Sequence, residues 1–146
     1  LFGEHGDSSF IPWSVANISN VPISKCNELI SLPGMESPAL NFDEIEQYVR
    51  KSGGRVIARK GATFYAVSIS VCHICKCLLA GIDTTMTVST MMHGEYGIDD
   101  VCLSTLNLVG HDGIRGKVNV PLTDEETAKL RFSADTLKGV IKNLNI

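Results

Sequence analysis

The chain has 146 residues, of which 44% are hydrophobic and 20% charged, and its formal net charge is −3. This length and composition fit one soluble globular domain and exclude the disordered and collagen-like classes. The basic residues form no cluster interleaved with aromatic ones, so we do not expect nucleic acid as a partner.

The cysteines and the apolar stretches indicate the cellular context. Five cysteines, an odd number, do not fit the paired framework of a small secreted domain, and the chain opens without the leader of a signal peptide. We therefore expect a cytoplasmic location. The most apolar stretch, residues 62–80, carries Ser68, Ser70, His73 and Lys76, which argue against a membrane span. We expect a buried helix there and no membrane partner.

The run GEHGDS, residues 3–8, places His5 between two glycines and two carboxylates. An imidazole can give or take a proton near neutral pH, and a partner carboxylate would fix its tautomer. The plain alternative is a solvent-exposed turn without a chemical role.

The first half of the chain predicts loops followed by two helices. Residues 12–20 are typical of a short helix or turn, and a loop with Pro22, Pro33, Gly34 and Pro38 follows. Asn41 and Glu44 have near-capping-box spacing before a helical apolar pattern, which predicts a helix start. Two further signals complete this half: Gly53-Gly54 predicts a kink or break, and a second helix is expected over residues 63–79, ended by Gly81.

The second half predicts strands and a terminal helix. Residues 85–91, 101–109 and 114–120 have strand patterns, the last two joined as a hairpin by residues 110–113, with Ile114, Val118 and Val120 on one face. Thr123 and Glu126 form a capping box. Apolar residues then recur at helical spacing: Leu130, Ala134, Leu137, Ile141 and Leu144.

These elements predict an α+β fold with an antiparallel sheet, without internal repeats. Neither G-x-G-x-x-G nor G-x-x-x-x-G-K-[ST] occurs, so the sequence contains no Rossmann domain and no recognisable site for a dinucleotide or a nucleoside triphosphate.

Several short motifs occur in order: GEHGDS at residues 3–8, PWS at 12–14, KGAT at 60–63, GEYG at 94–97 and GIR at 113–115. With SADTLK at residues 133–138, this set resembles the C-terminal half of an L-lactate dehydrogenase over the whole chain. The resemblance implies the C-terminal domain fold of the lactate/malate dehydrogenase family, with long helices packed on an antiparallel sheet. It also implies that residues 1–146 are one substrate domain, that the NAD-binding domain precedes residue 1, and that the protein is a homodimer or homotetramer.

The resemblance assigns roles to three residues. His5 is implied to be the proton donor and acceptor for the keto or hydroxy group, Thr63 to contact the 2-keto acid, and Val67 to lie near the nicotinamide ring of NAD. The family's D-x-x-R motif, which orients this histidine and grips the substrate carboxylate, would precede residue 1. Two positions depart from the pattern: Gly54 stands where relatives often carry tyrosine, and Gly116 where an acidic residue is common.

Other suggestive residues have structural explanations. Cys72, Cys75, Cys77 and His73 lie on different faces of one expected helix and cannot converge on a metal, so we expect buried cysteines that act as small apolar residues. No role is assigned to His93 or His111. The acidic pair Glu125-Glu126 is explained by helix capping and the helix dipole.

We therefore expect the substrate domain of an NAD-dependent L-lactate dehydrogenase, acting on a small 2-keto or 2-hydroxy acid and inactive by itself. Two alternatives stay open: a malate or L-2-hydroxyisocaproate dehydrogenase of the same family, or a noncatalytic assembly module. An upstream glycine-rich βαβ unit and D-x-x-R motif in the gene would favour an enzyme.

Overall fold

A computed structural model describes residues 1–26 and 40–144 of the protein. Helices and antiparallel strands are segregated along the chain, so the predicted α+β class is confirmed. The elements are β1 (Asn17–Ile18), β2 (Val21–Pro22), the 3-10 turn η1 (Ile23–Lys25), α2 (Phe42–Arg50), α3 (Ser52–Lys60), α4 (Tyr65–Ala80), β3 (Thr84–His93), the 3-10 turn η2 (Glu95–Gly97), β4 (Asp99–Gly110), β5 (Gly113–Lys117) and α5 (Asp124–Asn143).

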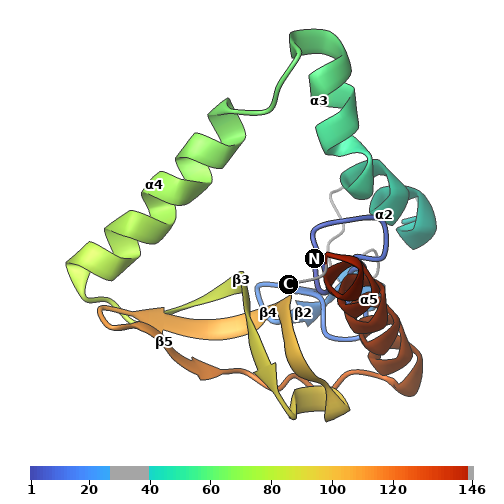
Figure 1. Ribbon diagram of the computed structural model, residues 1–146. Helices are drawn as coiled ribbons and strands as arrows, with labels where there is room; N and C mark the ends of the chain where they lie inside the picture. Colours follow the sequence, from blue (N-terminus) through green and yellow to red (C-terminus); the bar gives the residue numbers. More distant parts are fainter. Residues whose placement is uncertain (27–39, 145–146) are drawn as a thin grey trace.

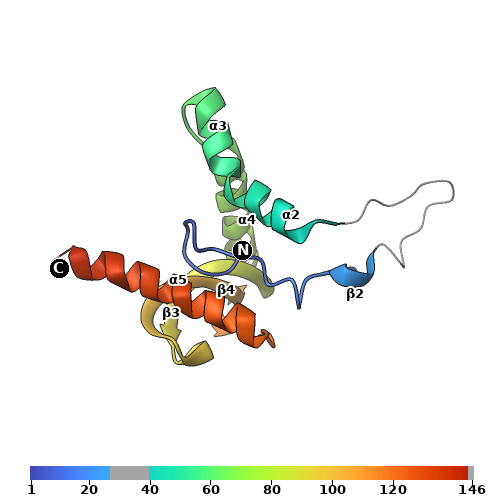
Figure 2. The same cartoon turned by 90° about the vertical axis from the view of Figure 1, so that its right-hand side faces the viewer.

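The main sheet has the order β3-β4-β5 and is antiparallel throughout. Helix α5 crosses one face of this sheet, as Figure 2 shows. The core lies at that contact, where apolar side chains of the sheet, of α5 and of the first ten residues meet. Its buried members are Phe2, Phe10, Met92, Ile98, Val101, Leu103, Leu130 and Ala134.

The predicted capping box begins α5 and also holds the N-terminal segment. The Thr123 hydroxyl accepts from the Glu126 amide, and the Glu126 carboxylate accepts from the Thr123 amide at 3.0 Å. The same carboxylate accepts from the amide of Ser14 at 2.9 Å and from its hydroxyl. Burial alone would raise the pKa of Glu126, but the hydrogen bonds from Ser14 and Thr123 outweigh it and lower this pKa below its ordinary value.

Helices α2, α3 and α4 form an arch that starts at the N-terminal segment and ends at the sheet (Figure 1). The Asn41 side chain caps α2 as predicted, by accepting from the Glu44 amide at 3.2 Å. The predicted break is present, but it lies at Lys51, and both Gly53 and Gly54 are inside the first turns of α3. Gly81 ends α4 at φ 65°, in the left-handed region that favours glycine.

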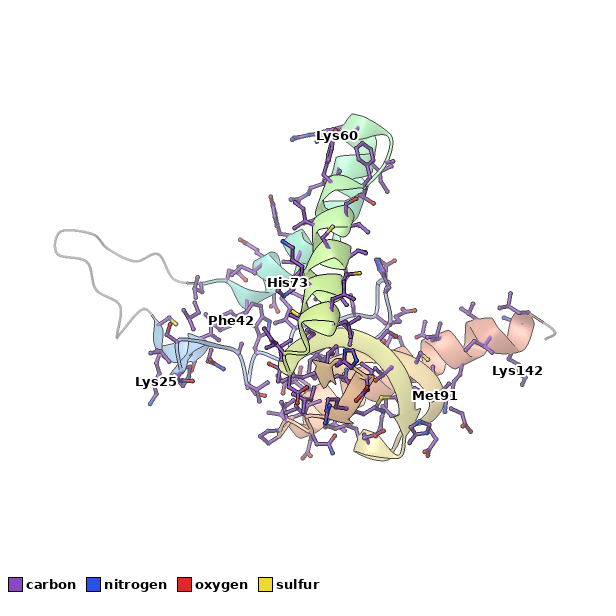
Figure 3. The ribbon with its side chains drawn as sticks, turned by 90° about the vertical axis from the view of Figure 1, so that its left-hand side faces the viewer. Lys25, Phe42, Lys60, His73, Met91 and Lys142 are labelled. Carbon is purple, nitrogen blue, oxygen red and sulfur yellow. The ribbon has the colours of Figure 1, made fainter. Side chains whose placement is uncertain are left out.

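The expectation of a buried helix over residues 62–80 is wrong for this chain. Every residue from 61 to 73 is exposed, and α4 contains no buried residue. The physical reason is that α4 approaches the sheet near its C-terminal end and extends away from it over the rest of its length (Figure 1). The side chains along most of the helix therefore project into solvent, as Figure 3 shows around the labelled His73. Of the described residues, no helix is both long and apolar enough to cross a bilayer.

The expectation of buried cysteines on this helix is wrong for the same reason. Cys72 and Cys75 are exposed and Cys77 is only half-buried.

Three smaller expectations agree with the structure only in part. The turn expected within residues 12–20 is present, but a two-stranded hairpin of β1 and β2 follows it, which the sequence did not indicate. Strand β5 ends at Lys117, so Val118 and Val120 lie beyond it, and Ile114 is exposed. A bulge between Leu108 and Val109 shifts the register and disrupts the simple alternation expected there. Pro33, Gly34 and Pro38 lie outside the described residues.

Candidate functional site

His5 is exposed at the tip of a short loop whose two ends pair like a hairpin. The backbones of Phe2 and Phe10 exchange hydrogen bonds of 2.8 and 3.1 Å, and both rings are buried in edge-to-face contact. Gly3 pairs with Ser104 of β4 through two backbone hydrogen bonds of 3.0 and 2.8 Å. The base of the loop is therefore fixed to the sheet, while its tip presents the imidazole.

Helix α5 holds the same loop through Ser133, which is fully buried. The Ser133 hydroxyl accepts from the Glu4 amide at 2.7 Å and lies 2.9 Å from the Ser8 hydroxyl. The Ser8 hydroxyl in turn donates to the Glu4 carboxylate at 2.5 Å. Gly3 has φ 98° and a β-carbon there would lie 2.6 Å from the Ser133 oxygen, so this close approach requires glycine.

Helix α2 contacts the far side of the loop through an ion pair. The Arg50 guanidinium donates to the Ser9 carbonyl from Nε at 3.1 Å and from Nη2 at 2.7 Å. Nη2 also lies 2.5 Å from Glu46 Oε1, and Glu46 Oε2 accepts from the Ile11 amide at 3.1 Å. Three separate elements, β4, α5 and α2, thus support the residues around His5.

Thr63 lies in the short link between α3 and α4. Gly61 ends α3 with φ 78°, and α4 begins two residues after Thr63. The link therefore turns sharply at the top of the arch, where Figure 1 shows the chain reversing from α3 to α4.

His5 and Thr63 line the same cleft beneath the arch, an open space of about 940 Å³. Its walls come from the N-terminal loop, from α2 and α3, and from the facing strands β3 and β4. The lining residues outside the loop include Val49, Arg50, Ile57, Thr87, Ser89, Cys102 and Ser104. The cleft formed by the described residues does not include Val67, which lies on α4 with 55% of its surface exposed.

This arrangement can carry out proton transfer to a ligand held in the cleft. An exposed imidazole on a firmly anchored loop can reach a polar atom of such a ligand and exchange a proton with it near neutral pH. Within residues 1–26 and 40–144, no side chain forms a hydrogen bond with the His5 ring, so an orienting partner is not supplied by the described part of the chain.

Sequence reasoning missed the residues that hold the loop. Ser133 appeared only as part of the SADTLK motif, and a single buried serine on a helix gives no signal that it contacts residue 4. Glu46 and Arg50 did carry a signal, because opposite charges four residues apart share a helix face, but such pairs are usually solvent-exposed. Of the described residues, no three His, Cys, Asp or Glu side chains lie together as metal ligands would.

A match to a family model shows which protein family the chain belongs to. Residues 1–145 match the model of the lactate/malate dehydrogenase, alpha/beta C-terminal domain. The chain belongs to this family. An L-lactate dehydrogenase of Thermoanaerobacterium saccharolyticum is 39% identical over 146 residues, which are 100% of this chain and 46% of that protein.

Solved structures of the family have the same fold. A lactate dehydrogenase from a Medee basin deep-sea metagenome library matches with a TM-score of 0.91 and 26% identity, over 99% of this chain and 45% of that one. A malate dehydrogenase from Archaeoglobus fulgidus, solved in complex with NADH, matches with a TM-score of 0.81 and 28% identity, over 99% of this chain and 43% of that one. This family member thus spans about half the length of the relatives it matches.

Proposed function

We propose that residues 1–146 form the substrate domain of an NAD-dependent L-lactate dehydrogenase that interconverts pyruvate and L-lactate. The observation that carries the proposal is that His5 and Thr63, far apart in sequence, line one cleft. The similarity to named L-lactate dehydrogenases supports the reaction class. The relatives are about twice as long as this chain, and in the proposal the nucleotide-binding part corresponds to the half that this chain does not cover.

In this proposal His5 is the acid of pyruvate reduction. As the keto carbon is reduced, negative charge develops on its oxygen, and the imidazolium of His5 donates a proton to that oxygen to form the hydroxyl of lactate. In the reverse direction the neutral ring accepts the same proton. The anchored loop suits this task, because a proton donor must stay within hydrogen-bonding reach of the reacting oxygen.

Thr63 positions the 2-keto acid in the proposal. Its side chain precedes α4 and lines the same cleft as His5, so its hydroxyl can hydrogen-bond a polar atom of the substrate.

NAD fits this chain only at the nicotinamide end. The sequence has no glycine-rich phosphate loop, whereas Val67 offers an exposed aliphatic side chain one turn beyond Thr63, against which a flat ring can pack. When bound, the reduced cofactor would supply the hydride. Val67 would then help to place the ring beside the cleft, while residues outside this chain hold the rest of the dinucleotide.

A malate dehydrogenase is the second candidate, favoured by the fold similarity to the Archaeoglobus fulgidus enzyme. The two candidates share the His5 chemistry and differ in the size and charge of the substrate group opposite the carboxylate.

One assay tests the proposal and separates the candidates. The whole protein that contains this chain is supplied with NADH and either pyruvate, 2-ketoisocaproate or oxaloacetate, and NADH oxidation is followed at 340 nm. We expect the highest kcat/KM with pyruvate. Preference for oxaloacetate would establish the malate alternative, and no turnover with any of the three would favour a noncatalytic module.

A further inference from the structure

We infer that Arg50 and Glu46 are positioning residues for His5, because together they tie the loop that carries the imidazole to the helix that forms the wall of the cleft. This inference rests on the proposed function, in which His5 transfers the proton. It adds two residues that contact neither the imidazole nor, in the proposal, the substrate.

The first observation is the geometry of the contact. Arg50 places two donors on one backbone carbonyl, that of Ser9, and Glu46 accepts from the backbone amide of Ile11. The two side chains are joined at 2.5 Å and only 26% and 17% exposed, so they are screened by solvent much less than a surface pair. The pair therefore grips the backbone on both sides of Phe10.

The second observation is that on the returning side of the loop Phe10 is held by Phe2, whereas its two neighbours depend on the pair of Arg50 and Glu46. Glu4 and Ser8 are held by Ser133 of α5, and Gly3 is held by β4. On the returning side, among the residues that the structure describes, the Ser9 carbonyl and the Ile11 amide have no partner other than Arg50 and Glu46. Without the pair, the backbone on both sides of Phe10 loses these side-chain contacts, so the tip that carries His5 can tilt about the fixed pairing of Phe2 with Phe10.

The third observation concerns Arg50 itself. Arg50, Val49 and Ile57 line the cleft, so the helices that carry the clamp also form the cleft wall. An arginine in a cleft could instead bind a substrate carboxylate. Here, however, Nε and Nη2 already donate to Ser9 and Glu46, so the forked pair of donors on that edge of the guanidinium is used by the loop and only Nη1 is left for a ligand.

The experiment compares Arg50→Gln and Arg50→Lys with Arg55→Gln in the whole protein. Arg55 is the matched control, because its guanidinium lies 4.1 Å from the centre of the Tyr48 ring on the neighbouring helix and does not line the cleft of the described residues. We expect Arg50→Gln to lower kcat about 10-fold to 100-fold with KM for pyruvate changed less than about 3-fold, because the loss is one of alignment. Arg50→Lys should recover only part of the loss, since a lysine cannot make the forked contact, and Arg55→Gln should match the original protein.

A second readout does not depend on activity. Amide hydrogen exchange at residues 9–11 should become at least about tenfold faster in Arg50→Gln, while the amides of α5 exchange as before. Unchanged exchange in this segment would overturn the clamp, whatever the activity. Faster exchange with unchanged kcat would overturn the positioning role, as would a large rise in KM at constant kcat, which would mark Arg50 as a carboxylate ligand.

The two proposals fail separately. If the unsubstituted protein has no dehydrogenase activity, the proposed function fails, and with it the positioning role in catalysis, while the exchange data still decide whether Arg50 clamps the loop.

Discussion

At the scale of single residues, the proposal depends most on the imidazole at the loop tip. Replacing His5 by asparagine in the whole protein removes the proton donor and keeps a polar side chain of similar reach. General acid catalysis contributes about 10² to 10⁴ in rate, so we expect kcat for pyruvate reduction to fall within that range. The measurement is NADH oxidation at saturating pyruvate.

The control for this substitution is His111→Asn, which changes an exposed histidine in the turn between β4 and β5. It should leave kcat unaltered. Equal activity of His5→Asn and the original protein would remove His5 from the reaction.

The buried hydroxyl of Ser133 allows a stability test at the same scale. Ser133→Ala leaves the Glu4 amide without its acceptor in a half-buried position, which costs about 1 to 3 kcal/mol. In urea unfolding, the variant should have a lower midpoint concentration, with an unchanged slope of the unfolding free energy against urea concentration. Ser70→Ala is the matched control, because that hydroxyl is exposed and donates only to the Ala66 carbonyl of its own helix. A loss no larger than that of the control would show that Ser133 does not hold the loop.

At the scale of elements, the sequence predicted the features that depend on residues close together in the chain. Asn41, Thr123 and Gly81 each mark a helix end, and the structure has a helix end at each, because capping involves residues only a few positions apart. The exposure of α4 could not be predicted, since the apolar composition of this helix is the same whether or not another part of the protein covers it. The residues that hold the His5 loop could not be predicted either, because residues 4 and 133 are far apart in the sequence and meet only in the folded chain.

Helix α3 carries two glycines that the structure does not require. A β-carbon at Gly53 or Gly54 meets no atom within 4 Å, and neither residue has a positive φ. We expect Gly53→Ala and Gly54→Ala each to stabilise the protein by about 0.5 to 1 kcal/mol through the higher helix propensity of alanine. Thermal unfolding is the measurement. Gly61→Ala provides the contrast, because its φ of 78° strains any side chain and should lower the melting temperature.

The first turn of α5 predicts how stability depends on pH. Burial opposes the charge of Glu126, yet the hydrogen bonds from Ser14 and Thr123 lower its pKa in the folded state. A carboxyl whose folded pKa is depressed binds fewer protons folded than unfolded, so its contribution is present above its ordinary pKa and is lost as pH falls below that value through the folded pKa. We expect the free energy of unfolding to fall in this acidic range, and to fall less in Glu126→Gln. Identical pH profiles for the two proteins would refute the assignment.

At the scale of the whole molecule, the described chain leaves a helix and a cleft open to solvent. Helix α4 leaves Tyr65, Ile69 and Leu79 at least 67% exposed, although apolar side chains of this size are usually covered. The relatives extend over more than twice the aligned length. The cleft that contains His5 and Thr63 is correspondingly open. The described chain therefore has the family's C-terminal domain fold, with α4 uncovered and the cleft open to solvent.

The proposed function predicts how residues 1–146 behave when they are expressed alone. Proton transfer needs the imidazole near a substrate held in a closed site, and an open cleft neither excludes water nor fixes the keto acid. We expect pyruvate-dependent NADH oxidation by this chain to be at least about 10³-fold below that of the whole protein, although its far-ultraviolet circular dichroism shows a folded α+β domain. Turnover comparable to that of the whole protein would mean that His5 and Thr63 carry out the reaction without the residues that lie outside this chain.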